Sequence, residues 1–208
     1  IHAYTDKYIV VKYGGNAMHN PDIIKTILQD VAALKIVGVH PILVHGGGPE
    51  INAMLGRLGI ESKTINGLRV TDKETMEVVQ MVLGGKVNKN IVAQLGTMGV
   101  KAIGLCGKDG NLISVKKMSN KNGVDFGFVG DITAINAALL KSLCRAGYIP
   151  VIASIGVGSA GESYNINSDT AAGEIGAAVG ADKLVYLTAI DGILADSNDK
   201  SSLLAEVR

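Results

Sequence analysis

The chain has 208 residues, 47% hydrophobic but only 4% aromatic, so we expect a core of small aliphatic side chains, as in layered α/β proteins. The 20 Lys and Arg residues balance 19 Asp and Glu residues, and a net charge of +1 excludes the basic surface typical of proteins that bind nucleic acid or anionic membranes. The two cysteines, Cys106 and Cys144, form no C-x-x-C pair, which favours a reducing compartment. No apolar run approaches the roughly 20 residues that cross a bilayer, so we expect a cytoplasmic protein.

The first half of the chain alternates strand and helix patterns. Strands are expected at Tyr8–Val11 and Ile42–Val44, and helices from Pro21 to about Val37 and from Pro49 to about Leu58.

A third helix is expected after the segment Gly67–Val70. Thr71 with Glu74 matches a capping box, and the helix is interrupted at Gly84-Gly85 before it resumes through Leu95. We assign four sulfur-containing side chains to the core: Met76, Met81, Cys106 and Cys144.

The second half continues the alternation. A strand over Ala102–Cys106 leads through a predicted hairpin turn at Lys108–Asn111 into Leu112–Val115. A helix is expected around Ala137–Ala146 and a strand at Pro150–Ser154. A last helix should run from Asp169 to about Val179, and a last buried strand over Lys183–Leu187.

The segment Gly156–Gly161 formally matches G-x-G-x-x-G. No helix pattern follows it, so it fails the context that a dinucleotide-binding motif requires, and a hairpin loop is the better interpretation.

Strand–helix alternation predicts parallel strands joined by right-handed crossovers, and therefore a three-layer αβα sandwich around a mainly parallel sheet. Such sheets bind ligands at the carboxyl ends of their strands. The polar residues at these ends are Lys12, His45, Ser154 and Thr188.

Three glycines, Gly46, Gly47 and Gly48, follow the second strand and precede Pro49. Glycine lets the backbone approach a ligand, and the unpaired N–H groups of a first helical turn attract carboxylate or phosphate oxygens. The alternative is a tight turn without a ligand. His45 is expected to be a packing and turn residue.

Four motifs occur in a specific order and spacing. They are Val10–Met18, Val44–Asn52, Asn66–Thr71 and Tyr164–Asp169. As a set they resemble the N-acetylglutamate kinases of the amino-acid kinase family, whose fold is like that of carbamate kinase.

The resemblance implies ATP-dependent phosphorylation of the γ-carboxylate of N-acetyl-L-glutamate, a step towards arginine. A carboxylate is ionised at neutral pH and needs no general base. It needs cations and N–H donors that offset the repulsion between two anions. Mg²⁺ is implied by ATP, and because phosphate oxygens and water normally hold it, no protein ligand for a metal is predicted.

The resemblance also implies the roles of individual residues. For catalysis they are Lys12, Gly15 and Asp169. For the acetylated amino acid they are Gly47, Gly48, Arg69 and Asn165. For the nucleotide they are Lys12, Gly14, Gly15, Thr188 and Gly192.

Simpler alternatives stay open for three of these side chains. Lys12 could be a strand-end surface lysine and Arg69 a solvated charge. Asp169 could be a helix N-terminal residue stabilised by the dipole.

The resemblance divides the chain into a substrate lobe, residues 1–160, and the start of an ATP lobe, residues 161–208, which lacks the family's second catalytic lysine. Ala189 stands where the family usually has an aspartate. The alternatives are therefore a non-catalytic acetylglutamate-binding regulatory protein and another kinase of the same family. An esterase and a P-loop kinase are excluded, because neither G-x-S-x-G nor G-x-x-x-x-G-K-[ST] occurs.

The implied partners are a second copy of the chain, in a homodimer or hexamer, and arginine or a nitrogen-signalling regulator.

Overall fold

A computed structural model describes residues 4–14, 21–65, 67–119, 123–188, 192–196, 199 and 201–206. The helices are α1 (Pro21–Ile36), α2 (Gly48–Leu58), α3 (Lys73–Gln80), η3 (Met81–Val87), α4 (Asn88–Thr97), η4 (Asp109–Asn111), α5 (Ala137–Arg145) and α6 (Ser168–Val179). The strands are β1 (Tyr8–Tyr13), β2 (His40–His45), β3 (Thr64–Ile65), β4 (Leu68–Arg69), β5 (Ala102–Leu105), β6 (Ile113–Lys117), β7 (Gly130–Ile135), β8 (Ile149–Ala153), β9 (Ile155–Val157), β10 (Ser163–Asn165) and β11 (Lys183–Leu187).

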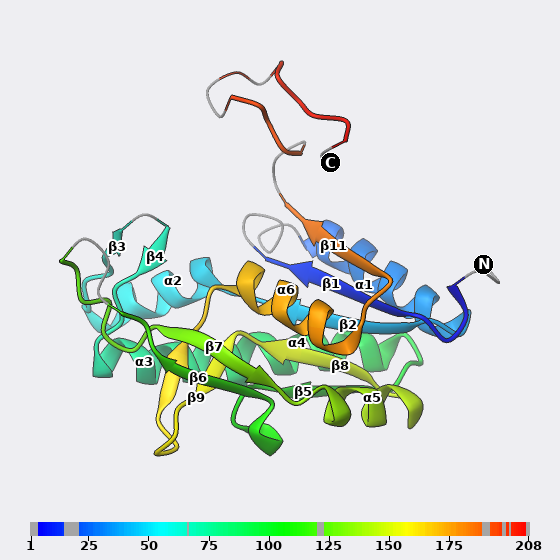
Figure 1. The fold of residues 1–208 in the computed structure, drawn as a ribbon, viewed down its shortest axis with the longest axis horizontal. Coiled ribbons are helices and arrows are strands. Elements are labelled where there is room, and N and C mark those ends of the chain that lie inside the picture. The colour runs from blue at the N-terminus through cyan, green and yellow to red at the C-terminus, as the bar shows by residue number, and fades with distance from the viewer. Residues whose placement is uncertain are drawn as a thin grey trace.

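The main sheet has five strands in the order β11-β1-β2-β8-β5, and every pair in it is parallel. Helices cover both of its faces (Figure 1). The three-layer αβα sandwich predicted from the alternation is therefore confirmed.

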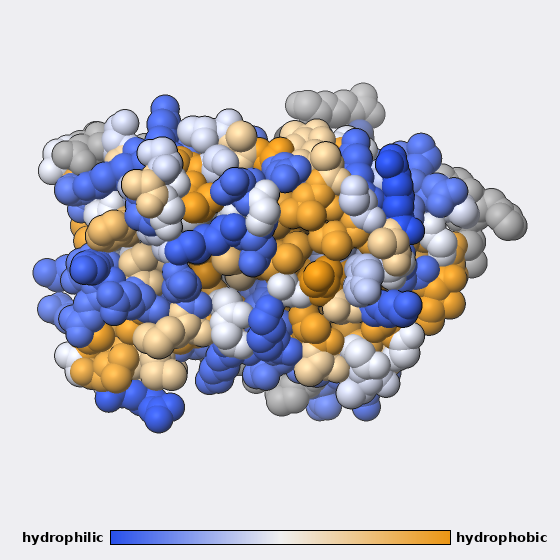
Figure 2. Space-filling model, turned by 90° about the horizontal axis from the view of Figure 1, so that it is seen from below, coloured by the Kyte–Doolittle hydropathy of each residue, from blue (hydrophilic) through white to orange (hydrophobic). Residues whose placement is uncertain are grey.

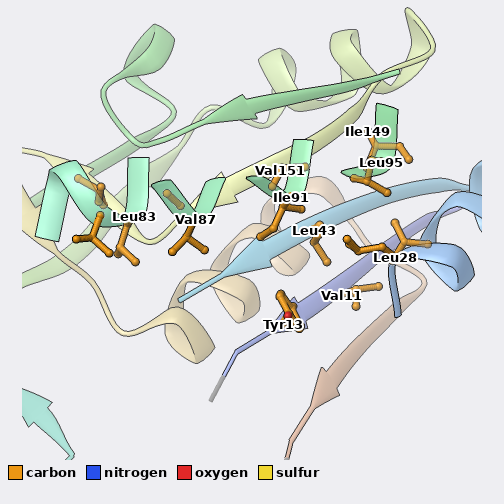
Figure 3. Close-up of a cluster of buried hydrophobic side chains, with 14 of the residues drawn as sticks. Val11, Tyr13, Leu28, Leu43, Leu83, Val87, Ile91, Leu95, Ile149 and Val151 are labelled. Atoms are coloured by element: carbon orange, nitrogen blue, oxygen red, sulfur yellow. The ribbon is translucent and has the colours of Figure 1, made fainter. Parts of the chain in front are cut away.

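The alternation of side chains along β1 explains the two cores. Ile9, Val11 and Tyr13 point into one cluster, which contains buried residues of α1, α2, α3 and α4, whereas Val10 belongs to a second cluster with α5 and α6. Figure 3 shows the first cluster, with Tyr13 and Val11 from β1 near Leu43 from β2. Strands covered on both faces are typical of parallel sheets.

A second sheet has the order β10-β9-β6-β7 and is mostly antiparallel. The hairpin predicted at Lys108–Asn111 is wrong. β5 pairs with β8 in the main sheet and β6 pairs with β7 in the second, so the 3-10 turn η4 carries the chain from one sheet to the other. The hairpin loop predicted for Gly156–Gly161 is confirmed, because β9 and β10 pair in antiparallel register on either side of it.

The third helix differs from its prediction at two points. Its N-cap is Asp72, not Thr71, because the Asp72 carboxylate accepts a hydrogen bond from the Thr75 N–H at 2.8 Å. The helix does not stop at Gly84-Gly85. The π-helix η3 carries its backbone through the glycines into α4, and Val82, Leu83 and Val87 are buried along it.

Two predicted core assignments are wrong. Met81 is 60% exposed, whereas Met76 and Cys144 are buried and Cys106 is partly exposed. The strand β11 forms an edge of the main sheet, and its Leu184, Val185 and Tyr186 are exposed. An apolar pattern predicts a buried strand only where a neighbouring element covers it.

Among the described residues, no helix is both long and apolar enough to cross a membrane. Seen from below, the surface carries apolar residues near its middle with hydrophilic residues around them (Figure 2).

Candidate active site

The glycine loop lies at the carboxyl end of β2, in the centre of the main sheet. His45 is in register with Tyr13 of β1 and Ala153 of β8, and the Gly46 N–H donates to the Tyr13 carbonyl at 3.3 Å. A Cβ atom on Gly47 would lie 2.6 Å from Leu83 Cδ2, so only glycine fits there without movement of a buried side chain. Pro49 then lies in the first turn of α2.

The buried side chain of His45 hydrogen-bonds the glycine loop. It is fully buried, and its Nδ1 donates to the Gly46 carbonyl at 2.8 Å while its Nε2 accepts from Asn88 Nδ2 at 3.0 Å. Asn88, at the start of α4, also donates to the Val151 carbonyl at 2.9 Å. Burial lowers the pKa of His45 to about 4, so the ring is neutral at pH 7. The predicted packing and turn role of His45 is confirmed.

A groove of about 220 Å³ opens above the glycine loop. Its walls come from the loop and α2, from β4, from β10 and from the first turn of α6. It brings together all four residues that the sequence predicted for the acetylated amino acid: Gly47, Gly48, Arg69 and Asn165.

Two hydrogen bonds hold the Arg69 side chain near the N-terminus of α2. Its Nη2 donates to the Gly48 carbonyl at 3.4 Å, and its Nη1 donates to the Ser62 hydroxyl, which in turn donates to Asn52 Oδ1 at 3.3 Å. Burial lowers the pKa of Arg69. The guanidinium is thus partly desolvated and fixed at the N-terminus of a helix, and the alternative of a freely solvated charge is excluded.

Asn165 faces the groove from the opposite side. Its Nδ2 donates to the Thr71 hydroxyl at 3.3 Å, and its backbone N–H donates to the Phe128 carbonyl at 2.8 Å. Thr71 is fully buried. These bonds fix an amide side chain in the wall of the groove, where it can hydrogen-bond a neutral amide of a ligand.

Lys12 and Asp169 form an ion pair beside the groove. Lys12 Nζ lies 2.9 Å from Asp169 Oδ1, and although the lysine is buried, 54% of the aspartate side chain is exposed. Asn167 Oδ1 caps α6 by accepting from the Asp169 and Thr170 N–H groups. Both interpretations of Asp169 are therefore compatible, whereas Lys12 is no surface lysine.

The residues predicted for the nucleotide are only partly described. A Cβ atom on Gly14 would lie 3.3 Å from Lys12 Cε, so a glycine there leaves room for the lysine. Thr188 follows β11, whose Leu187 is in register with Tyr13, and therefore lies near Gly14 at the carboxyl edge of the sheet. Gly192 packs near Leu203 and does not line the groove. Gly15 and Ala189 lie outside the described residues.

Several groove residues were given no role in the sequence analysis, although two of them lie within the motif Tyr164–Asp169. Leu83 comes from the π-helix, and Asn167 and Ser168 come from the first turn of α6. Asn167 could have been recognised as a helix N-cap, but no local signal places Leu83 beside Gly47. Among the described residues, no cluster of three His, Cys, Asp or Glu side chains could hold a metal ion.

Glycine turns and a buried lysine at the carboxyl edge of a parallel sheet offer the N–H donors and the positive charge that phosphoryl transfer requires, and no P-loop motif occurs in the sequence. The family model described as "Amino acid kinase family" matches residues 7–208, and the chain belongs to that family. Over 216 residues it is 56% identical to the acetylglutamate kinase of Heliobacterium modesticaldum, and the match covers 100% of the chain and 73% of that protein. The predicted resemblance is confirmed.

Solved structures agree on the fold. The protein smu.665 from Streptococcus mutans matches with a TM-score of 0.79 and 32% identity, over 90% of this chain and 74% of that one. The carbamate kinase of Giardia matches with a TM-score of 0.67, over 94% of this chain and 76% of that one, and at 12% identity it supports the fold alone.

Proposed function

We propose that the chain transfers the γ-phosphoryl group of ATP to the γ-carboxylate of N-acetyl-L-glutamate, which yields an acyl phosphate and serves arginine biosynthesis. The observation that carries the proposal is the groove in which Gly47, Gly48, Arg69 and Asn165 lie together. The identity to an acetylglutamate kinase supports the same substrate.

Arg69 binds the α-carboxylate of the substrate. Its planar guanidinium is positioned by Ser62 and by the Gly48 carbonyl, and two parallel N–H donors match a carboxylate better than an ammonium does. Asn165 hydrogen-bonds the acetamido group, which is neutral and offers one donor and one acceptor.

The γ-carboxylate and the phosphoryl group meet near the glycine turns. The N–H groups of Gly47 and Gly48 donate to the γ-carboxylate at the positive end of α2, and Lys12 and the Gly15 N–H stabilise the negative charge on the transferring phosphoryl oxygens. Asp169 orients Lys12 through the 2.9 Å ion pair. No proton has to be removed from the nucleophile, so these residues act by positioning and electrostatic stabilisation.

ATP approaches from the side of Gly14 and Thr188, and Mg²⁺ accompanies its phosphates. On this interpretation residues 1–160 form the lobe that binds the amino acid and residues 161–208 begin the nucleotide lobe, with Asn165 contributed to the amino-acid groove from the start of the second segment. The nucleotide-binding role of Gly192 and the cytoplasmic location stay predictions. The same holds for the homodimer or hexamer and for regulation by arginine or a nitrogen-signalling partner.

Calorimetric titration of the chain with N-acetyl-L-glutamate tests the proposal. We expect binding that Arg69→Ala weakens by about 100-fold or more, as the loss of a bidentate charged contact implies. Arg57→Ala is the matched control, because Arg57 lies exposed in the last turn of α2, at the opposite end of that helix from the Gly48 carbonyl that Arg69 contacts. Absence of binding to the unmodified chain would overturn the proposal.

A second assay separates catalysis from mere binding. Hydroxylamine traps an acyl phosphate, so hydroxamate formed from N-acetyl-L-glutamate and Mg-ATP identifies phosphoryl transfer. Binding without hydroxamate would favour the non-catalytic regulatory protein. Competition by aspartate, carbamate or UMP with N-acetyl-L-glutamate would favour another kinase of the family.

A further inference from the structure

Two buried polar atoms flank the active-site glycines without a hydrogen-bond partner among the described residues. One is the hydroxyl of Tyr13, a side chain that is 1% exposed, and the other is Oε2 of Glu50, in the first turn of α2. A buried hydroxyl or carboxylate oxygen without a partner is costly, so such atoms in a native protein call for an explanation.

The two residues come from two different elements beside the active-site glycines. Tyr13 ends β1 between Lys12 and Gly14, on the phosphoryl side, and Figure 3 shows its side chain among the buried residues of the first cluster. Glu50 follows Gly48 and Pro49, on the carboxylate side.

The end of β1 and the glycine loop before α2 are in contact through their backbones. The Gly46 N–H donates to the Tyr13 carbonyl at 3.3 Å, and the position of a Cβ atom on Gly47 is 3.6 Å from Glu50 Oε2. A small relative movement of β1 and α2 therefore changes the distance between the hydroxyl and the carboxylate.

Their chemistry is complementary. Burial and, second, the charge of Glu50 raise the pKa of Tyr13 to about 12, so the phenol keeps its proton at neutral pH and can donate it. A carboxylate oxygen is an acceptor, and a hydrogen bond to a charged acceptor is stronger than one between neutral groups.

We propose that Tyr13 Oη donates a hydrogen bond to Glu50 Oε2 when ligands occupy the groove, and that this bond fixes the end of β1, with Lys12, against the Gly47–Gly48 turn at the start of α2. The inference rests on the proposed function, since N-acetyl-L-glutamate and the phosphoryl group would contact one loop each. Tyr13 and Glu50 are positioning residues, because both act through the glycines and Lys12.

A double-mutant cycle in the full chain tests the pairing. We expect Tyr13→Phe to weaken N-acetyl-L-glutamate binding by about tenfold when Glu50 is present, and by less than twofold in a Glu50→Met background, where the acceptor is absent. In a Glu50→Gln background, which keeps a carbonyl acceptor, Tyr13→Phe should again weaken binding. Tyr8→Phe, on the same strand and stacked on His40, should change affinity by less than twofold.

The melting temperatures of the same variants without ligand distinguish positioning from structural support. We expect the effects of Tyr13→Phe and Glu50→Met on the unliganded melting temperature to add, because the bond is not yet made. Coupling of equal size with and without ligand, or additive effects on affinity, would overturn the inference and leave the proposed function intact. Failure of the unmodified chain to bind N-acetyl-L-glutamate would overturn both.

Discussion

Lys12 Nζ lies 2.9 Å from Asp169 Oδ1 although the two residues are far apart in the sequence. The ion pair joins the carboxyl end of β1 to the first turn of α6. Because the aspartate side chain is 54% exposed, solvent screens the attraction, and the pair contributes at most about 1 kcal/mol to stability. The main effect of the ion pair is to orient the buried side chain of Lys12.

Asp169→Asn should therefore impair phosphoryl transfer without unfolding the protein. We expect kcat to fall on the order of 10- to 100-fold because the lysine is misplaced, with a decrease in melting temperature of at most about 2–4 °C. Asp182→Asn is the control, since Asp182 pairs with Lys7 at 3.1 Å near the other end of β1, and it should leave kcat unchanged. Equal losses in both variants would refute the orienting role of Asp169.

Gly47→Ala should damage the groove. The new methyl group would lie 2.6 Å from Leu83 Cδ2, and relief of this overlap displaces either the loop or a buried side chain, at about 1–3 kcal/mol. We expect a loss of affinity for N-acetyl-L-glutamate on the order of tenfold by calorimetry. Gly56→Ala, in the same helix with nothing within 4 Å of its Cβ position, should bind normally and gain up to about 1 kcal/mol of stability.

His45 should make the protein sensitive to acid. Its folded-state pKa of about 4 lies below the ordinary value of 6.5, so the unfolded chain binds the proton more readily. The stabilisation is fully present above about pH 6.5 and is lost as the pH falls towards 4, which amounts to about 2 kcal/mol at pH 5. Urea unfolding at pH 7.5 and pH 5.0 measures this loss.

His45→Gln isolates this contribution, because glutamine can still hydrogen-bond Asn88 but does not titrate. The difference in unfolding free energy between the two pH values should shrink by about 2 kcal/mol in the variant. An unchanged difference would mean that other groups carry the pH dependence.

Gly127→Ala should be far more destabilising than Gly59→Ala. Both glycines have positive φ, +70° and +72°, and an alanine in that region costs about 1–2 kcal/mol. At Gly127 the methyl group would also lie 2.2 Å from the Thr71 carbonyl oxygen, in the backbone that holds Thr71 beside Asn165. We expect a total cost of at least about 3 kcal/mol at Gly127, measured by chemical denaturation, whereas similar costs at both positions would show that the backbone adjusts.

Local rules were sufficient for the elements of the main sheet. Strand–glycine–proline order at Val44–Pro49 predicted the turn and the N-terminus of α2, because glycine and proline restrict the backbone through their own geometry. The motifs Asn66–Thr71 and Tyr164–Asp169 also indicated Arg69 and Asn165, and both residues line the groove.

Exposure could not be predicted in the same way. The sequence predicted that Met81 and the apolar residues of β11 belong to the core. Met81 and three of these β11 residues are exposed, because burial depends on which other element packs against them. The π-helix η3 shows the same limit, since Gly84-Gly85 favours a break and tertiary packing of Val82, Leu83 and Val87 overrides it.

The sequence by itself determined the order of strands and helices, the glycine loop and the residue types that phosphoryl transfer to a carboxylate requires. Only the tertiary structure decided that Leu83 packs against Gly47 and that Asn88 hydrogen-bonds His45. It also decided that Tyr13 Oη and Glu50 Oε2 are buried without a hydrogen-bond partner in the described part of the chain. The physical reason is the difference in the sequence range over which the two kinds of interaction act. Backbone propensities act over a few neighbouring residues, whereas a site is built from contacts between elements that only the folded chain brings together.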